Sequence, residues 1–370
     1  MKNLSLLAYT LTVLISVSPL QAYERGVEYP YQQEMIRLAS PFFAIEIMPQ
    51  SAGRISSVKL PPPYGELLAP SEISVVEETP LFRYPKDNMN GIFELFWGEK
   101  LNGSNPMQIQ EKTPYSVTLE SRFYGNLLLD LRRKISICPD ALEIRVQSIF
   151  TNRSGKSWKL RPWIHLVGTH PSSPQIPQQP GTHRRPGFGI VGDASVPKLF
   201  TFNKNNNFIP PGADWIGTRL NGKKVVWALI LPENTLQNDG IFYSWGDGKD
   251  NGIQTSEIIW PEFQLPDNSF AAINYTILIF PGLEQLNGII GKTGIEIRNG
   301  KLIMSFAADE PERVVTISYK NSDGSKNSAT IRIPSGRAGS QRIIPMPWQN
   351  IPLEATWQNG NSPAKALFFP

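Results

Sequence analysis

From Phe42 onward, apolar and polar residues alternate with a period of two along most of the chain. The pattern is clear in "SVTLESRFYG" (116–125), "NLLLDLRRKISI" (126–137) and "ALEIRVQSIFTN" (141–152). Such alternation is typical of β-strands that bury one face and leave the other polar. Proline, glycine, asparagine and aspartate separate the runs, and no long amphipathic helix pattern interrupts them. The sequence therefore predicts an all-β protein built around a large sandwich or barrel of antiparallel strands.

The strand pattern changes near "GLEQLNGIIGKTG" (282–294), and a new series of short strands follows. Two turns in this series, at Asn299–Gly300 and Asp323–Gly324, have the composition of tight β-hairpins. We therefore expect two domains after the leader, a large one at 23–290 and a small β-sandwich at 291–370.

The first 22 residues have the layout of a secretory signal peptide. Lys2 gives a basic start, a mostly apolar run extends from Leu6 to Leu20, and the small residue Ala22 marks the expected cleavage site. The apolar run is too short to span a bilayer comfortably, and no later segment has about 18 uninterrupted apolar residues. The sequence thus predicts a secreted or periplasmic protein without a membrane span.

Composition excludes several classes of function. The formal net charge is +4 and no long basic run occurs, so a nucleic-acid partner is not expected. The only cysteine, Cys138, cannot form an internal disulfide. The three histidines, His165, His170 and His183, lack a carboxylate at ligand spacing, so neither a metal nor another cofactor is expected.

A candidate site begins with "WKLRPWIHLVGTH" (158–170). On a strand, Trp163 and His165 point to one face, while Ile164 and Leu166 point to the other. If the Ile164 and Leu166 face is the core, Trp163 and His165 line a cleft on the opposite face. An aromatic ring beside an imidazole suits stacking and hydrogen bonding to a sugar. An ordinary buried histidine with its hydrogen bonds satisfied is the alternative.

Glu257 is the candidate base. It lies within the apolar run "SEIIW" (256–260), where burial would raise its pKa and favour proton removal near neutral pH. A strand-edge glutamate paired with an arginine is the alternative interpretation.

Other side chains are weaker candidates for contacts with a substrate. Glu262 lies five residues after Glu257, Trp245 offers a stacking surface in a glycine-rich turn, and Glu94 lies in the rim-like segment "FELFWGEK". The Pro-rich loop at 169–193 carries Arg184–Arg185 and is either a positive flap or an exposed loop with incidental charge.

Three segments, in this order, resemble the galactose mutarotase-like (aldose 1-epimerase-like) family: "FFAIEIMPQSAGRISSVKL" (42–60), "ALEIRVQSIFTNRSGKSWKLRPWIHLVGT" (141–169) and "SEIIWPEFQLPDNSFAAINYTILIFPG" (256–282). The resemblance covers roughly residues 40–285. It implies a β-supersandwich whose concave face binds a sugar.

In the family's enzymes a glutamate removes the proton of the anomeric hydroxyl and a histidine protonates the ring oxygen. By position, His165 matches the histidine and Glu257 matches the glutamate, with Glu262 as a substitute. Arg54, in the Gly-Arg-Ile turn, would contact sugar hydroxyls or a carboxylate. The family's epimerases also use an earlier histidine, whereas no histidine precedes His165 here.

Three classes of function therefore remain open. The first is an exported carbohydrate-binding protein, with or without acid/base epimerisation of the sugar. The second is a non-catalytic structural or protein-interaction β module. The third is a polysaccharide lyase-related protein, which would recruit Tyr243 and the loop of Arg184–Arg185. None of these requires a cofactor.

Overall fold

The structure is a computed structural model. It describes the following residues: 35–68, 76–78, 83–85, 91–96, 106–124, 127–168, 172–178, 180–181, 183–185, 189–191, 195–201, 207–209, 211–220, 222–236, 239–244, 254–346, 348, 352, 354–359 and 365–369. The predicted signal peptide, residues 1–22, lies outside these ranges and stays a prediction. Within them, no helix has the length and apolar character needed to cross a bilayer.

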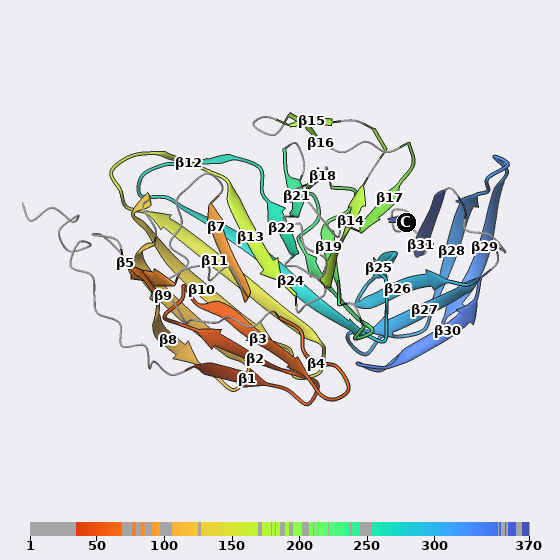
Figure 1. The fold of residues 1–370 in the computed structure, drawn as a ribbon, viewed down its shortest axis with the longest axis horizontal. Helices are drawn as coiled ribbons and strands as arrows, with labels where there is room; N and C mark the ends of the chain where they lie inside the picture. Colours follow the sequence, from red (N-terminus) through yellow and green to blue (C-terminus); the bar gives the residue numbers. More distant parts are fainter. Residues whose placement is uncertain are drawn as a thin grey trace, which may run out of the picture.

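Strand pairing among the described residues produces two nine-stranded antiparallel sheets (Figure 1). In spatial order, the first large sheet contains β1 (Ile36–Ala39), β2 (Ala44–Met48), β3 (Arg54–Leu60), β7 (Gly91–Phe96), β13 (Pro162–Val167), β22 (Thr255–Ile259), β21 (Ile241–Ser244) and β18 (Asn207–Ile209), with β4 (Gly65–Glu66) paired to β3.

In the same way, the second large sheet contains β17 (Lys198–Thr201), β14 (Ser172–Gln178), β19 (Trp215–Leu220), β20 (Val225–Ile230), β24 (Phe270–Pro281), β11 (Glu143–Asn152), β10 (Leu129–Ile137), β9 (Ser116–Tyr124) and β8 (Gln108–Lys112). Three two-stranded ribbons accompany the large sheets: β12 (Trp158–Leu160) with β23 (Phe263–Leu265), β15 (His183–Arg185) with β16 (Gly189–Val191), and β5 (Val76–Glu78) with β6 (Arg83–Pro85).

One core lies between the two large sheets, and the alternation in the sequence explains it. Ile164 and Leu166 of β13 and Ile258 of β22 contribute from the first sheet, and Leu131 and Ile135 of β10 contribute from the second. All five side chains are almost fully buried. Burial of this apolar area, at about 25 cal/mol per Å², is the main force that holds the sheets face to face.

The C-terminal strands form a separate sandwich with its own core. Its first sheet contains β25 (Gly288–Ile290), β26 (Thr293–Arg298), β27 (Lys301–Phe306) and β30 (Gln341–Pro345), and its second contains β29 (Lys326–Ile333), β28 (Arg313–Lys320), β31 (Glu354–Asn359) and β32 (Lys365–Leu367). Asn299 and Gly300 both have positive φ (51° and 69°) in the β26–β27 hairpin, which confirms the turn predicted there.

The C-terminal sandwich is joined to the second large sheet at several points. The end of the chain returns to that sheet, where the backbone N–H of Leu199 donates to the carbonyl of Phe369. The ammonium of Lys292, in the turn between β25 and β26, donates to the carboxylate of Glu143 at the start of β11. The described part of the chain is all-β with sandwiched antiparallel sheets, as predicted. The exact domain boundary at residue 290 stays a prediction.

Candidate functional site

A row of residues crosses five neighbouring strands of the first large sheet. The strand register pairs them directly, from β7 through β13, β22 and β21 to β18: Phe93, His165, Glu257, Tyr243 and Phe208. Directly paired residues in a sheet share a face, and their immediate neighbours along each strand occupy the other face. The neighbours Ile164, Leu166 and Ile258 lie in the main core, so this row is on the face turned away from it.

The row brings the two principal sequence candidates into contact. The Nε2 atom of His165 lies 3.7 Å from Oε1 of Glu257. Both side chains are almost fully buried, with 3% and 1% of their side-chain surface exposed. The distance exceeds that of a hydrogen bond, so the pair is a close contact of two titratable groups in a dry environment.

Neutral donors hold the Glu257 carboxyl. The indole N–H of Trp163 donates to Oε2 at 2.5 Å, and the Thr255 hydroxyl donates to Oε1. Burial raises the pKa of Glu257 to about 8, although the two hydrogen bonds oppose that rise. This carboxyl therefore gains and loses its proton close to neutral pH, which is the range a general base or acid needs.

His165 is shifted in the opposite direction. Burial, together with the positive charge of Arg54, lowers the pKa of His165 to about 3. The imidazole is therefore neutral at pH 7, and its contact with Glu257 is not an ion pair under those conditions. A neutral imidazole can accept and donate one hydrogen bond each, which suits binding of a hydroxyl group.

Aromatic side chains flank the pair on both sides. The Trp163 ring meets the His165 ring edge to face, with centroids 5.8 Å apart. Tyr243 stacks on Phe208 with centroids 4.5 Å apart. Burial and the nearby Glu257 raise the pKa of Tyr243 to about 12, so its hydroxyl stays protonated and can act as a donor. Flat apolar rings beside hydrogen-bonding groups are the usual composition of a small-ligand site.

Arg54 reaches the site from the start of β3. Its guanidinium stem passes over Gly91, where an added Cβ would lie 2.9 Å from Cδ of Arg54. Glycine at this position therefore leaves the space that the arginine stem occupies. Arg54 is 2% exposed and its charge acts on His165.

The structure thus brings together His165, Glu257, Trp163 and Arg54. Glu94 on β7 pairs with Ile164 on β13, so its register position is adjacent to the row that contains His165 and not within it. Glu262 is 45% exposed and lies 3.7 Å from Lys159, away from this contact. Trp245 lies outside the described residues.

Sequence reasoning missed Thr255 and Phe208. Thr255 precedes Glu257 by two positions on the same strand, so strand alternation would have placed both on one face. For Phe208 there was no such signal, because it reaches the row only through the pairing of β18 with β21.

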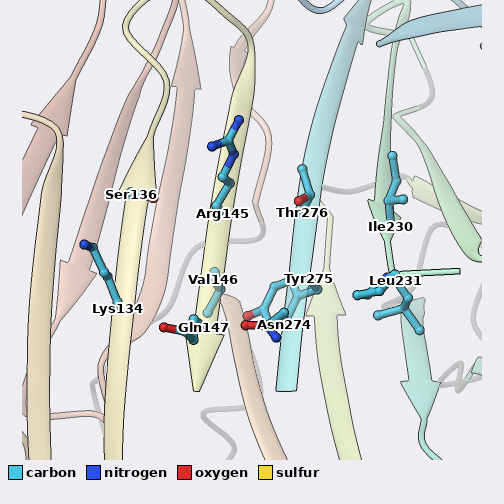
Figure 2. A pocket seen from close by; sticks show the side chains of 11 residues that line it. Lys134, Ser136, Arg145, Val146, Gln147, Ile230, Leu231, Asn274, Tyr275 and Thr276 are labelled. Atoms are coloured by element: carbon cyan, nitrogen blue, oxygen red, sulfur yellow. The ribbon is translucent and has the colours of Figure 1, made fainter. Parts of the chain in front are cut away.

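A pocket with a volume of about 420 Å³ lies on the second large sheet. Figure 2 shows side chains that line it. They come mainly from β10, β11, β20 and β24 and are Lys134, Ser136, Arg145, Val146, Gln147, Ile230, Leu231, Pro232, Asn274, Tyr275 and Thr276. The lining contains neither a carboxylate nor a histidine, so it offers no counterpart to the Glu257 and His165 pair. The described residues also contain no group of three or more histidine, cysteine, aspartate or glutamate side chains suited to a metal ion.

No family model and no curated protein matches this chain. Among solved structures, it is similar to the galactose mutarotase related enzyme from Lactobacillus acidophilus, at 9% identity and a TM-score of 0.48 over 68% of this chain and 99% of that one. It is also similar to a galactose mutarotase-like protein from Clostridium acetobutylicum, at 10% identity and a TM-score of 0.46 over 66% and 94% of the two chains.

A third similarity is to a TPR-domain containing protein from Parabacteroides distasonis, with 14% identity and a TM-score of 0.50. It covers 66% of this chain and 46% of that one. Two of these solved structures are thus described as galactose mutarotase related or galactose mutarotase-like, which is the family that the sequence motifs resemble. At identities of 9–14% the similarity concerns the fold and assigns no activity to this chain.

Proposed function

We propose that the protein binds a carbohydrate at the face of the first large sheet that carries His165 and Glu257, and that Glu257 exchanges a proton with a sugar hydroxyl. The contact between these two side chains, on the face turned away from the core, carries the proposal. The aromatic rings of Trp163 and Tyr243 beside the pair support a sugar as the ligand class.

The protonation states assign separate roles to the two residues. Glu257, whose pKa is about 8, can accept the proton of an anomeric hydroxyl while the bond between the anomeric carbon and the ring oxygen breaks, and the ring oxygen takes its proton from the protonated Glu257 or from solvent. Ring closure after rotation reverses these transfers. His165 is a neutral imidazole at neutral pH because its pKa is about 3, so it lacks the acidic proton of an imidazolium ion and cannot act as the general acid. We therefore assign His165 the role of a neutral hydroxyl ligand, and Arg54 that of the fixed positive charge beside it.

Calorimetric binding to a panel of neutral and acidic mono- and oligosaccharides tests the proposal. We expect a sugar that binds the wild type to lose at least about tenfold in affinity with Glu257→Gln and with His165→Ala, because each removes a hydrogen-bonding group from a buried site. Glu262→Gln is the matched control, because this glutamate is half exposed and lies outside the row. Binding that survives both site variants would contradict the proposed site.

Anomer-exchange NMR on the sugar identified in this way separates an epimerase from a binding protein. We expect Glu257→Gln to abolish any exchange above the uncatalysed rate, whereas Glu262→Gln leaves it unchanged. Equal exchange rates with the wild type and with Glu257→Gln would contradict a role of Glu257 in catalysis.

The near-complete burial of the pair favours a second candidate function, a non-catalytic structural or protein-interaction module. In that case the Trp163–Glu257–Thr255 hydrogen bonds serve only to satisfy a buried carboxyl. Failure of every saccharide in the panel to bind would support this candidate over the first.

We also propose that the protein is exported to the periplasm or the outside of the cell, on the signal-peptide layout of residues 1–22. Mass spectrometry of the mature protein, purified from a cell fraction, tests this directly. An N-terminus near residue 23 is expected, and an intact Met1 in the cytoplasmic fraction would contradict export.

A further inference from the structure

Arg133 occupies an unusual place for an arginine. It lies on β10 between two exposed cations, Arg132 and Lys134, yet it points into the core together with Leu131 and Ile135. Only 1% of its surface is exposed. A buried guanidinium carries a large desolvation cost and persists only where its hydrogen bonds are well placed.

Its hydrogen bonds link the two large sheets. The Nε–H of Arg133 donates to the Ser148 hydroxyl on the neighbouring strand β11, 3.1 Å away. Its Nη1 donates to the backbone carbonyl of Ala52, which belongs to the turn between β2 and β3 of the other sheet. Burial lowers the pKa of Arg133 to about 10, although the nearby Tyr275 opposes this, so the group remains a cation at neutral pH.

The turn that Arg133 holds is strained and leads directly into Arg54. Ala52 and Gly53 both have left-handed backbone angles (φ 58° and 63°), and for alanine this conformation is costly. The turn is closed by hydrogen bonds from Ser51 N–H to the Met48 carbonyl and from Arg54 N–H to the Ser51 carbonyl, both 3.1 Å. The carbonyl that receives Arg133 is therefore two residues before Arg54.

The surroundings of this turn leave Gly53 little freedom to shift. A Cβ added to Gly53 would lie 2.7 Å from Cδ1 of Leu119 and 2.9 Å from Sδ of Met107. On the other side, the stem of Arg54 is packed against Gly91. The position of the Arg54 guanidinium is thus set by the turn at one end and by β7 at the other.

We propose that Arg133 is a positioning residue: by holding the Ala52 carbonyl, it fixes the guanidinium of Arg54 beside His165. Arg133 contributes no atom to the face that carries the candidate site, and it acts only through the turn. The inference rests on the proposed function in taking that face as the site, but the experiment below needs no sugar, so the two ideas can fail separately.

The pKa of His165 depends on the charges around it, so its titration midpoint reports whether the Arg54 guanidinium stays close. Among the described residues, Glu257 faces it from β22, Arg54 acts from β3, and Tyr243 follows in the row on β21 and stays neutral. Its partner on β7, Phe93, carries no charge. Below pH 6 Glu257 is protonated as well, so Arg54 is the charge that changes the His165 titration there.

The experiment is histidine-selective ¹⁵N NMR on the full mature chain, followed from pH 8 down to the acid limit of the folded state. The chain has three histidines, and the signal of His165 is assigned by its loss in His165→Gln. In Arg133→Met we expect the His165 midpoint to rise by at least about one pH unit, because Arg54 moves away. The matched control, Arg132→Met, changes the exposed neighbour on the same strand and leaves the midpoint unchanged.

A double variant separates positioning from a general loss of packing. In the Arg54→Met background, adding Arg133→Met is expected to produce no further shift of the His165 midpoint, since both act through one charge. An unchanged midpoint in folded Arg133→Met, or an equal further shift in the Arg54→Met background, overturns the proposal.

Arg133→Lys covers the case in which Arg133→Met fails to fold. Lysine keeps the charge, but its single ammonium cannot reproduce the planar fork that reaches both Ser148 and Ala52. We expect a smaller shift in the same direction, and a His165 midpoint identical to that of the wild type would overturn the proposal.

Discussion

Two glutamates of this protein are almost equally buried, and their environments are opposite. Glu257, in the row of the first large sheet, is 1% exposed and is held by the neutral donors Trp163 and Thr255. Glu143, at the junction with the C-terminal sandwich, is 3% exposed and is paired with Arg145 and Lys292.

The difference decides the charge of each carboxyl. Burial alone would raise the pKa of both. At Glu143 the hydrogen bonds and charges of Arg145 and Lys292 outweigh burial, and its pKa is lowered. At Glu257 burial outweighs the hydrogen bonds from the two neutral donors, and its pKa is raised to about 8. A carboxyl that joins two parts of the fold is thus kept charged, whereas the candidate functional carboxyl is kept ready to exchange a proton.

The largest expected effect is on the pH dependence of stability. Because the pKa of Glu257 is higher in the folded state than its ordinary 4.5, the folded protein binds the extra proton between about pH 5 and pH 8. The contribution of Glu257 to the free energy of unfolding therefore falls as pH rises through this window, by up to about 1.4 kcal/mol per unit. Urea unfolding of the wild type and of Glu257→Gln at several pH values measures it.

The difference between the two proteins isolates this residue, because other groups titrate in both. We expect Glu257→Gln to gain in stability relative to the wild type as pH rises from 5 to 8. Parallel pH profiles would show that Glu257 titrates normally and would remove the contrast with Glu143.

Loss of the charge at Glu143 is expected to have a smaller effect than the Glu257 titration. We expect Glu143→Gln to lower the free energy of unfolding by about 2 kcal/mol at pH 7. Glu143→Gln removes the charge that Arg145 and Lys292 share, and a hydrogen bond to a charged group typically contributes 1.5–3 kcal/mol. Because the folded pKa of Glu143 is lowered, the contribution is fully present above about pH 4.5 and is lost as pH falls through the folded value. Thermal or urea unfolding of the wild type and of Glu143→Gln measures the loss of stability at pH 7 and its decrease at pH 4.

A double variant sharpens this second prediction. If Lys292 stabilises the protein through Glu143, Lys292→Met should have little further effect in the Glu143→Gln background. Fully additive losses would show that the two side chains act separately.

The smallest effect is expected at an exposed pair. Lys159 and Glu262 are 67% and 45% exposed, and their charged atoms lie 3.7 Å apart. Solvent screens such pairs, so Glu262→Gln should change the free energy of unfolding by less than about 0.5 kcal/mol. A loss comparable with that of Glu143→Gln would contradict the distinction between buried and exposed carboxyls.

Local pattern was sufficient to predict much of the structure. Strand alternation placed Ile164 and Leu166 on one face of their strand and His165 with Trp163 on the other, because side chains of a strand alternate whatever their partners are. The structure then shows that the face with Ile164 and Leu166 packs in the main core. The Asn299–Gly300 turn was equally predictable, since few residue pairs tolerate positive φ at both positions.

Other features were beyond local pattern. The run Arg132–Arg133–Lys134 is typical of a surface segment with three cations. Its central arginine is nevertheless buried and donates a hydrogen bond to a turn of the other sheet. Only the packing of the two sheets decides which strand face is covered.

The sequence by itself determined the all-β class and that His165 lies on the strand face opposite Ile164 and Leu166, because both follow from a period of two. The tertiary structure decided that His165 meets Glu257, which lies 92 positions further along the chain, through the pairing of β13 with β22. It also decided their protonation, because a pKa depends on burial and on neighbouring charges, and both exist only once distant strands have come together.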